Sequence, residues 1–327
     1  MKGVAPRSWR GVLGLALLAA CGWAASCDRT GKDPGKGKIV VGFSQIGAES
    51  AWRTAETQSI KSEAANRGIA LLFSDAQQKQ ENQIKAVRAF IAQKVDFIIL
   101  APVVETGWEP VLREAQRENI PVVLADRAIT VTDDSLYATL VSPDVVEEGR
   151  MAARWLARKT GGKAGIAELL GTVGSSPAID RQMGFHEVIA QYPGMKIIKA
   201  QSGDFTRAKG KEVMESFLKS PEGKGLTAVY AHNDDMALGA IQAMEESGIK
   251  PGKDVLIVSI DGVRGAFEAM IEGKLNCTVE CNPLLGPGIF DAIEALRAGK
   301  TVPKKISLPE RLFEQETAAE DVKTRKY

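Results

Sequence analysis

Histidine is scarce in this chain, and neither sign of charge is in excess. The 327 residues include two histidines, His186 and His232, without the spacing of metal ligands. A histidine-rich metal site or a Ser-His-Asp triad therefore has little to build from. The 42 basic and 41 acidic side chains leave a formal net charge of +1. A nucleic-acid surface or a polybasic membrane patch needs clustered excess charge, so we expect neither.

Cysteine is also sparse, and two of the four cysteines are badly placed for a disulfide. Cys277 and Cys281 lie four residues apart in a stretch with an extended pattern, which would separate their Cα atoms by roughly 13 Å. A disulfide requires less than about 7 Å. We therefore predict two unpaired thiols, with no bridge and no metal site.

The amino-terminal apolar run is short. Residues 11–20 (GVLGLALLAA) are too few to cross a bilayer as a helix, and with the basic residues before them they are typical of a signal-peptide core. The run ends in LAAC, which resembles the bacterial lipoprotein cleavage box and predicts lipidation of Cys21. Lipidation of Cys27, or a plain signal peptide, is the alternative. We expect residues 1–27 to be this export segment and residues 28–37 to be a flexible tether, so that only a lipid anchor touches the membrane.

From Lys38 onward, short apolar runs alternate with amphipathic stretches. Strands are predicted at 38–44, 69–74, 97–100, 121–125 and 137–141, and then at 164–169, 196–200, 228–231 and 255–260. Helices are predicted at 52–67, 82–93, 107–119, 145–159, 179–191, 207–219 and 236–247. Strands separated by such helices imply parallel βαβ units, and continuous apolar strands imply helices on both faces. The sequence therefore predicts an α/β fold of two similar doubly wound parallel-sheet lobes.

Polar residues of both signs follow many of these strands. A ligand of a doubly wound sheet lies beyond the carboxyl ends of the strands, where unpaired charges are costly unless they meet each other or a ligand. The residues concerned are Arg53, Asp126, Arg127, Arg181, Asn233 and Asp261. A mixed set suits a neutral polyol, because each hydroxyl is both donor and acceptor. Salt bridges between the lobes, or solvated loop charges, are the alternative interpretation.

Two aromatic residues are placed to contact a sugar ring. Trp52 lies where the first helix should begin, a poor position for a core residue, and Phe205 follows a strand between two polar residues. An aromatic face packs against the apolar C–H face of a sugar, while polar groups bind its hydroxyls. We expect Trp108 to be structural and His232 to be a packed or capping residue.

Nucleotide-binding signatures are missing. No G-x-G-x-x-G follows the first strand, and the segment Gly203–Lys211 has neither the spacing of a P-loop nor a Ser or Thr after its lysine. The segment Gly171–Ser175 could cradle an anion at a helix N-terminus, but a tight capped turn is the favoured interpretation. We expect no cofactor.

Several segments carry a family resemblance that covers Lys38 to about Gln315. They include GFSQIGAESAWRTAE, LAPVVETGW, ADRAI, GTVGSSPAIDRQMGF, QSGDFTRAKG, AHNDDMALGA, SIDGVRGA and TVECNPLLGP. The chain resembles the periplasmic sugar-binding proteins of ABC transporters, the cluster of ribose-, galactose- and galactofuranose-binding proteins. GAESAWRTAE, APVVETGW and TVECNPLLGP resemble the galactofuranose-binding members most, which makes galactofuranose the leading ligand. The resemblance implies a monomeric type I periplasmic binding protein that encloses a monosaccharide and delivers it to a membrane permease.

The resemblance also implies roles for individual residues. Trp52 at the first turn and Phe205 in the Asp-Phe pair would stack on the sugar ring, and the other site residues would bind its hydroxyls. The implied site consists of Glu49, Trp52, Arg53, Asp126, Arg127, Arg181, Phe205, Asn233, Asp261 and Asn282. Ribose-binding members carry paired phenylalanines at the first turn, so Trp52-Arg53 argues against ribose.

Family members have three hinge crossings and discontinuous lobes. By analogy the hinges lie near Ser142-Pro143, Cys281-Asn282 and Leu308. The amino-terminal lobe would then comprise residues 38–142 plus 283–308, and the carboxyl-terminal lobe residues 143–282 plus 309–320.

Other functions are compatible with parts of this sequence pattern. A LacI-type repressor has the same ligand-binding fold but carries a helix-turn-helix where this chain has residues 1–37. A sugar receptor for a chemotaxis or sensor-kinase partner, or a homologue that binds a pentose or another hexose, remains an alternative. A glycosidase needs two carboxylates that face one glycosidic bond. Asp126 and Asp261 have better assignments in binding, so we expect no enzyme.

Overall fold

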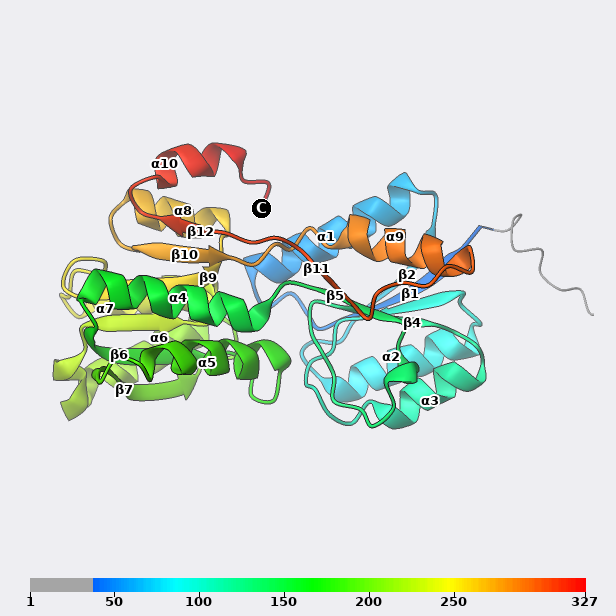
Figure 1. The fold of residues 1–327 in the computed structure, drawn as a ribbon, viewed down its shortest axis with the longest axis horizontal. Coiled ribbons are helices and arrows are strands. Elements are labelled where there is room, and N and C mark those ends of the chain that lie inside the picture. The colour runs from blue at the N-terminus through cyan, green and yellow to red at the C-terminus, as the bar shows by residue number, and fades with distance from the viewer. Residues whose placement is uncertain (1–37) are drawn as a thin grey trace, which may run out of the picture. The chain divides into compact units, whose positions relative to one another are not determined.

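The computed structural model describes residues Lys38–Tyr327, which form one compact unit. The predicted export segment, the tether and the lipidation site Cys21 lie outside the described residues. Within the described part, two six-stranded sheets each carry helices on both faces (Figure 1). None of its helices is both long enough and apolar enough to cross a membrane.

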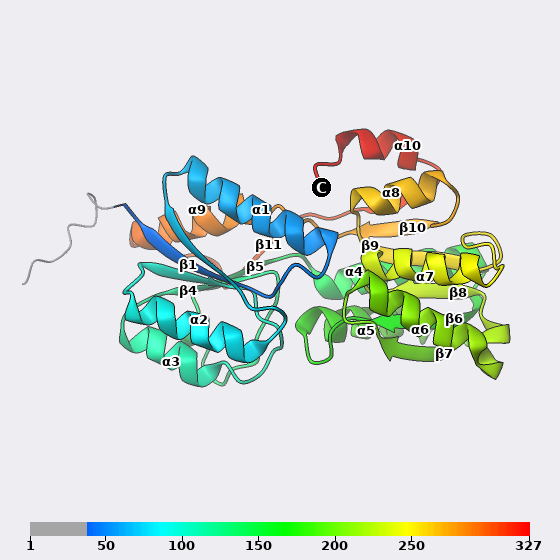
Figure 2. The ribbon, with the colours of Figure 1, turned by 180° about the vertical axis from the view of Figure 1, so that it is seen from behind.

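The first sheet has the strand order β11-β5-β4-β3-β1-β2, and all of its strand pairs are parallel. Its strands are β1 (Val40–Gln45), β2 (Ala70–Asp75), β3 (Phe97–Leu100), β4 (Val122–Ala125), β5 (Thr139–Ser142) and β11 (Lys305–Ser307). Its helices are α1 (Ala51–Asn66), α2 (Gln80–Ala92), α3 (Glu109–Arg117) and α9 (Gly286–Arg297). Helices α1 and α9 pack together over one face, and α2 and α3 cover the other (Figures 1 and 2).

The second sheet has the order β12-β10-β9-β8-β6-β7 and is parallel except for the edge strand β12. Its strands are β6 (Lys163–Leu170), β7 (Gly194–Ser202), β8 (Ala228–Ala231), β9 (Leu256–Asp261), β10 (Cys277–Glu280) and β12 (Leu312–Glu314). The helices are α4 (Val145–Thr160), α5 (Ser176–Ile189), α6 (Arg207–Lys219), α7 (Asp234–Glu246), α8 (Arg264–Ile271) and α10 (Ala318–Asp321). Helices α4 and α5 pack as one pair and α6 and α7 as another, on opposite faces (Figure 2). The prediction of two α/β lobes is confirmed.

Local sequence explains where the helices begin. Ser50 precedes α1, and its side chain accepts a hydrogen bond from the backbone N–H of Arg53 at 3.1 Å. Asp144 caps α4 and Asn233 caps α7 in the same way. These side chains satisfy backbone donors that the first helical turn leaves free. The caps therefore fix helix starts directly after strand ends, which is where the site lies.

The core of the first lobe is divided by its sheet. Phe43 and Phe290 lie in the cluster under α1 and α9, whereas Phe90 and Trp108 lie in the cluster under α2 and α3. Trp108 is fully buried, and its indole N–H donates to the Val104 carbonyl at 2.6 Å, so the prediction that it is structural is confirmed.

The chain passes between the two sheets three times. One passage leads from β5 to α4, the second from β10 to α9, and the third from β11 to β12. The expected hinge positions lie on or beside these passages. Their action as hinges, and the lobe boundaries built on them, stay predictions.

Candidate functional site

A cavity lies beyond the carboxyl ends of the strands of both sheets, with about 280 Å³ of empty space that includes space open to solvent. It is lined by Glu49, Ser50, Trp52, Arg53, Asp126, Arg127, Pro177, Arg181, Phe205, Asn233, Asp261 and Cys281. The structure thus brings together every residue of the predicted site except Asn282.

Three carboxylates of the first lobe surround the guanidinium group of Arg53. Its nitrogens donate to Glu49 at 3.0 Å, to Glu56 at 2.5 Å and to Asp126 at 2.8 Å. Burial lowers the pKa of Arg53, but the three negative charges outweigh burial and raise that pKa well above its usual range. Glu56 lies behind the cavity, where Gln45 also donates to it at 2.9 Å. Arg53 is therefore a fixed, fully charged group in the cavity wall.

Arg127 is less completely paired. One terminal nitrogen donates to the Val103 carbonyl at 2.9 Å, while the buried Nε has no hydrogen-bond partner. Burial and the nearby charge of Arg53 lower the pKa of Arg127 to about 10. The Glu49 Oε2 atom is likewise buried without a partner. Arg127 Nε lies 3.7 Å from the Asp126 carboxylate, too far for a hydrogen bond. Buried polar atoms rarely remain unsatisfied, so these two atoms, on residues that line the cavity, are candidates for ligand contacts.

The second lobe supplies Arg181 and Asp261. Arg181 donates to Glu148 at 2.7 Å and to the His232 carbonyl at 2.5 Å, and it lies 3.7 Å from Asp261. Burial raises the pKa of Asp261 well above its usual range, against the opposing charge of Arg181. Burial therefore favours the protonated form of Asp261, and a protonated carboxyl both donates and accepts hydrogen bonds.

The two predicted aromatic residues come from different lobes. Trp52 belongs to the first turn of α1 but packs with the buried core of the second lobe, and its indole N–H donates to the Cys281 carbonyl at 2.6 Å. Phe205 follows β7, and the guanidinium group of Arg127 lies 5.3 Å from its ring centre. Trp52 thus lines the cavity and packs in a core at once, so the expectation that its position suits a core residue poorly is wrong, and its contact with a sugar ring stays a prediction.

The two predicted asparagines have other partners in the structure. The Asn233 side chain caps α7 through the Met236 N–H, and its amide donates to the Phe205 carbonyl at 3.0 Å. It therefore holds the Phe205 loop as well as lining the cavity. Asn282 accepts from the Leu284 N–H at 2.9 Å and does not line the cavity. Its neighbour Cys281 lines the cavity instead.

Several lining residues have left-handed backbone conformations. Asp126 has φ 64°, Phe205 has φ 60° and Asp261 has φ 130°. Such angles are strained for residues with a Cβ and are concentrated at functional sites. Asp126 directly follows β4, Asp261 ends β9, and Phe205 lies in the loop between β7 and α6, so each unusual angle lies close to a strand end, at a residue that lines the cavity.

Direct hydrogen bonds join the lobes around the cavity. The Ala51 N–H donates to Asp235 at 2.7 Å, and the Ala128 N–H donates to Ser176 at 2.9 Å. The Glu105 N–H donates to the Gly174 carbonyl at 2.9 Å. Because each bond links an element of one sheet to an element of the other, the structure is a closed conformation.

The remaining candidates have structural roles. Thr206 caps α6, and a Cβ on Gly210 would lie 2.6 Å from the backbone of Met236. The glycines of this segment therefore allow close packing against α7. His232 is buried and contacts Glu168 at 3.3 Å, which confirms the prediction that it is packed. Cys277 and Cys281 are both free and buried, as predicted.

Comparison with known proteins places this geometry among binding proteins. Residues 41–300 match the family model described as periplasmic binding protein domain. The galactofuranose-binding protein YtfQ of Escherichia coli (strain K12) is 54% identical over 291 residues, which cover 88% of this chain and 92% of that protein.

Two solved structures are similarly close. One is the periplasmic binding protein component of the arabinose ABC transporter from Shewanella sp. ANA-3, bound to α- and β-L-arabinofuranose. It has a TM-score of 0.86 and 59% sequence identity, and the match covers 88% of this chain and 96% of that chain. A protein from Mycobacterium smegmatis in complex with β-D-fucofuranose has a TM-score of 0.86 and 47% identity, with 88% and 95% coverage.

Proposed function

We propose a function from the premise that the chain belongs to the periplasmic binding protein family. The protein encloses one furanose monosaccharide between its lobes and delivers that sugar to the permease of an ABC transporter. The leading ligand is galactofuranose. The observation that carries the proposal is the cavity between the two lobes, lined by aromatic rings and by paired charges of both signs.

The charges of the cavity favour a neutral ligand. Three arginines line it, namely Arg53, Arg127 and Arg181, together with three carboxyl residues, Glu49, Asp126 and Asp261. Arg53 and Arg181 are already paired with buried carboxylates, so a charged ligand would have to compete with these pairs. A polyol would not, and its hydroxyls can donate to carboxylates and accept from guanidinium groups.

The furanose ring is the chemistry that the named ligands of the similar proteins share. L-Arabinofuranose, D-galactofuranose and D-fucofuranose have the same configuration at ring carbons C2 to C4 and differ in the chain attached to C4. A site that is shaped for this ring would bind all three, and its contacts to the exocyclic chain would rank them.

Each residue of the predicted site has a role in this proposal. Trp52 and Phe205 present aromatic faces to the ring, one from each lobe. The unpartnered atoms Glu49 Oε2 and Arg127 Nε bind ring hydroxyls, with Asp126 and Arg53 beside them. Arg181, Asn233 and Asp261 complete the set from the second lobe, and Asn282 holds the passage that carries Cys281.

The mechanism is closure about three hinges. Only the closed form contacts the sugar from both lobes, so the sugar shifts the population towards that form. We place the hinges near Ser142-Pro143, Cys281-Asn282 and Leu308. The amino-terminal lobe would comprise residues 38–142 plus 283–308, and the carboxyl-terminal lobe residues 143–282 plus 309–320. We further propose that the protein is a monomer without enzymatic activity, anchored outside the cytoplasm by a lipid on Cys21.

Calorimetric titration of the full chain tests this function. Equilibrated D-galactose contains both ring forms, L-arabinose is the smaller analogue, and methyl galactopyranoside and ribose are the negative controls. We expect one-to-one binding of galactose or arabinose and a loss of at least about tenfold, or 1.4 kcal/mol, in the Trp52→Ala variant. Phe73→Ala is the matched control, because that ring is 38% exposed on β2 and lies outside the cavity. Absence of binding to every sugar would leave only the fold.

A further inference from the structure

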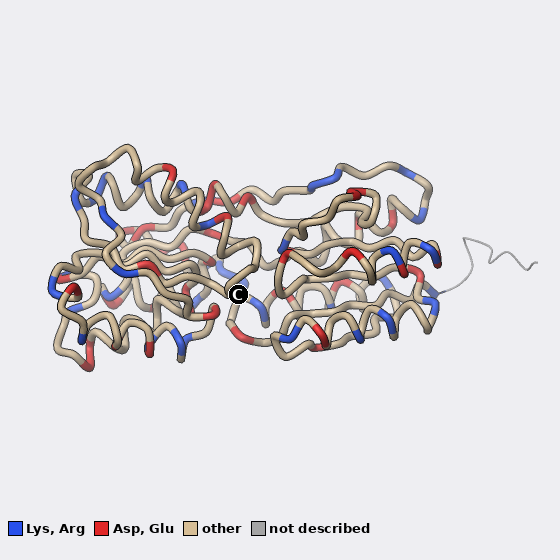
Figure 3. The backbone as a smooth tube through the Cα atoms, turned by 90° about the horizontal axis from the view of Figure 1, so that it is seen from below, with Lys and Arg blue, Asp and Glu red and all other residues tan. Residues whose placement is uncertain are grey.

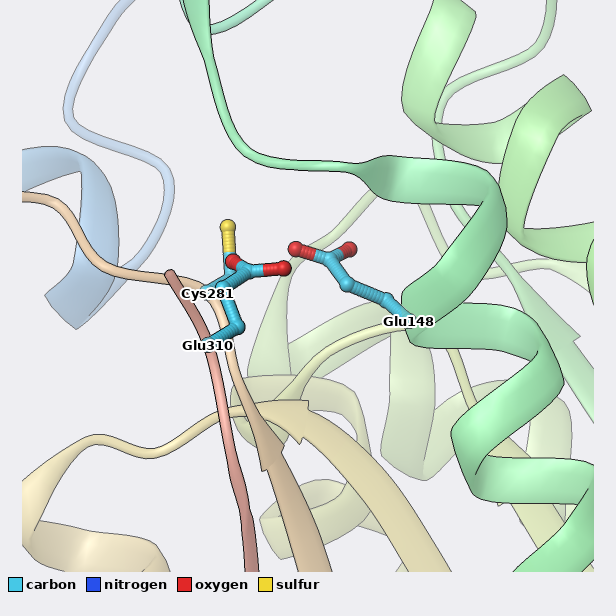
Figure 4. A group of neighbouring side chains, drawn as sticks. All are labelled: Glu148, Cys281 and Glu310. Carbon is cyan, nitrogen blue, oxygen red and sulfur yellow. The ribbon is translucent and has the colours of Figure 1, made fainter. Parts of the chain in front are cut away.

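Two buried carboxyl groups face each other beside the cavity. Glu148 lies on α4, and Glu310 lies on the passage between β11 and β12; their side chains point toward one another in Figure 4. The Oε1 atoms of both residues are buried and have no hydrogen-bond partner among the described residues. With the Cys281 thiol, they form a group whose ligand-type atoms lie within 4.8 Å of one another. Two negative charges cannot both persist at such a place without a positive group between them.

The same pair is connected to the ligand site through Arg181. The second oxygen of Glu148 accepts a hydrogen bond from Arg181 Nε at 2.7 Å, on the side away from the cavity lining. The neighbouring acid Glu280 is already paired, with Arg325 at 2.6 Å and with the Tyr327 hydroxyl at 3.1 Å. Glu148, whose Oε1 atom also lacks a partner, is thus the acid left to interact with Glu310.

A proton fits this place better than a metal ion. Burial, reinforced by the charge of Glu148, raises the pKa of Glu310 to about 11, against the opposing charge of Arg181 and with a further rise from Glu280. Burial and Glu148 also raise the pKa of the Cys281 thiol well above its usual range. A metal ion would have to displace both protons and compete with the Arg181 cation for Glu148.

We propose that Glu310 and Glu148 are positioning residues of the ligand site: the protonated Glu310 carboxyl donates a hydrogen bond to Glu148 Oε1, and the pair orients the Arg181 guanidinium toward the sugar. The inference rests on the proposed sugar binding and extends it. Since Glu310 lies on the third passage between the lobes, the bond links a predicted hinge to Glu148, which in turn contacts Arg181 of the cavity wall.

Replacement of Glu310 separates this role from simple packing. Glu310→Gln keeps an N–H donor for Glu148, whereas Glu310→Ala removes it. With galactose or arabinose as the probe, we expect Glu310→Ala to weaken binding by about tenfold and Glu310→Gln by less than about threefold. The matched control is Glu320→Ala on α10, an acidic side chain that is 79% exposed and should leave the affinity unchanged. Equal losses in the two Glu310 variants would overturn the proposal.

Infrared difference spectroscopy gives a second, sugar-independent measurement. The wild type at pH 7 should show the band of a protonated carboxyl group that Glu310→Gln lacks and Glu320→Ala retains. Absence of that difference, or stoichiometric zinc in the purified protein, would overturn the proposal, because a metal ion would then replace the proton.

The two measurements also distinguish the inference from the function on which it rests. A wild type that binds no sugar defeats the proposed function, whereas the infrared band still reports the proton between the carboxyl groups. Should Glu310→Ala fail to fold, as a thermal unfolding scan would reveal, Glu148→Gln is the second variant. It removes the charge that Arg181 contacts and should weaken sugar binding by about tenfold. Unchanged affinity in Glu148→Gln would overturn the proposal.

Discussion

Removal of the Arg53 side-chain charge should destabilise the first lobe strongly, because Arg53 is the shared partner of three buried carboxylates. Arg53→Met keeps an unbranched side chain of similar length and leaves Glu49, Glu56 and Asp126 facing one another. Breaking a buried ion pair by removing one partner costs about 3–5 kcal/mol. At about 2–4 °C per kcal/mol for a chain of this size, the unfolding midpoint should fall by roughly 6–20 °C.

The loss of stability should depend on pH in a defined direction. In the wild type, burial and the charge of Asp126 raise the pKa of Glu56, while Arg53 opposes the rise. Without Arg53 that pKa rises further above its unfolded value of 4.5. A carboxyl group with a raised pKa in the folded state destabilises the fold as pH rises through that pKa. The deficit of the variant should therefore be larger at pH 8 than at pH 5.

Thermal and urea unfolding of the sugar-free protein at pH 5, 7 and 8 measure both effects. The matched control is Arg88→Met, since Arg88 pairs with Glu114 at 2.8 Å on the exposed surface, where solvent screens the pair. The control should leave the midpoint almost unchanged. A deficit below about 1 kcal/mol for Arg53→Met at pH 7, which is the scale of a surface pair, would refute the reasoning. So would a deficit that is equal at pH 5 and pH 8.

Two further predictions concern the packing of the Phe205 ring and the charge of His186. A Cβ on Gly171 would lie 1.9 Å from the Phe205 ring, so Gly171→Ala should displace that ring. We expect this variant to weaken sugar binding by at least about tenfold in a calorimetric titration. The control is Gly288→Ala, which should leave binding unchanged because a Cβ there meets its nearest atom at 3.5 Å. A hydrogen bond to Glu168 raises the pKa of His186, so their interaction stabilises the fold below pH 6.5 and the gain is lost as pH rises through the raised pKa. His186→Gln should therefore lower the unfolding midpoint more at pH 5.5 than at pH 8.5, and the reverse order would contradict this.

The strands and helices up to Asp261 could be predicted because their patterns are local. β3 (FIIL) and β8 (AVYA) are fully buried apolar runs, and the structure places both as predicted. The edge strands β11 and β12 are three residues each, KIS and LFE, and no local pattern distinguishes them from loops. Helix α9 begins at Gly286-Pro287, a pair that usually indicates a turn but that a first helical turn also accepts.

The site could be predicted mainly because the fold type places ligands at strand ends. What the sequence did not determine was which face of an extended segment meets the cavity. Asn282 and Cys281 are adjacent, and successive side chains of an extended chain point to opposite sides. Glu148 and Glu310 were missed for another reason, since 162 positions separate a helical residue from a loop residue (310 − 148 = 162). Only the folded passages bring them together.

The three passages between the sheets also constrain the order in which the molecule can be completed. The first sheet has five strands within residues 40–142 but receives its edge strand β11 from residues 305–307, and α9 covers it from residues 286–297. The second sheet likewise receives its edge strand β12 only from residues 312–314. A chain that is still growing therefore exposes the open edges of β5 and β10, and such edges can pair with other chains. Neither lobe can be finished before nearly the whole polypeptide is available, so the two lobes mature together although each has its own core.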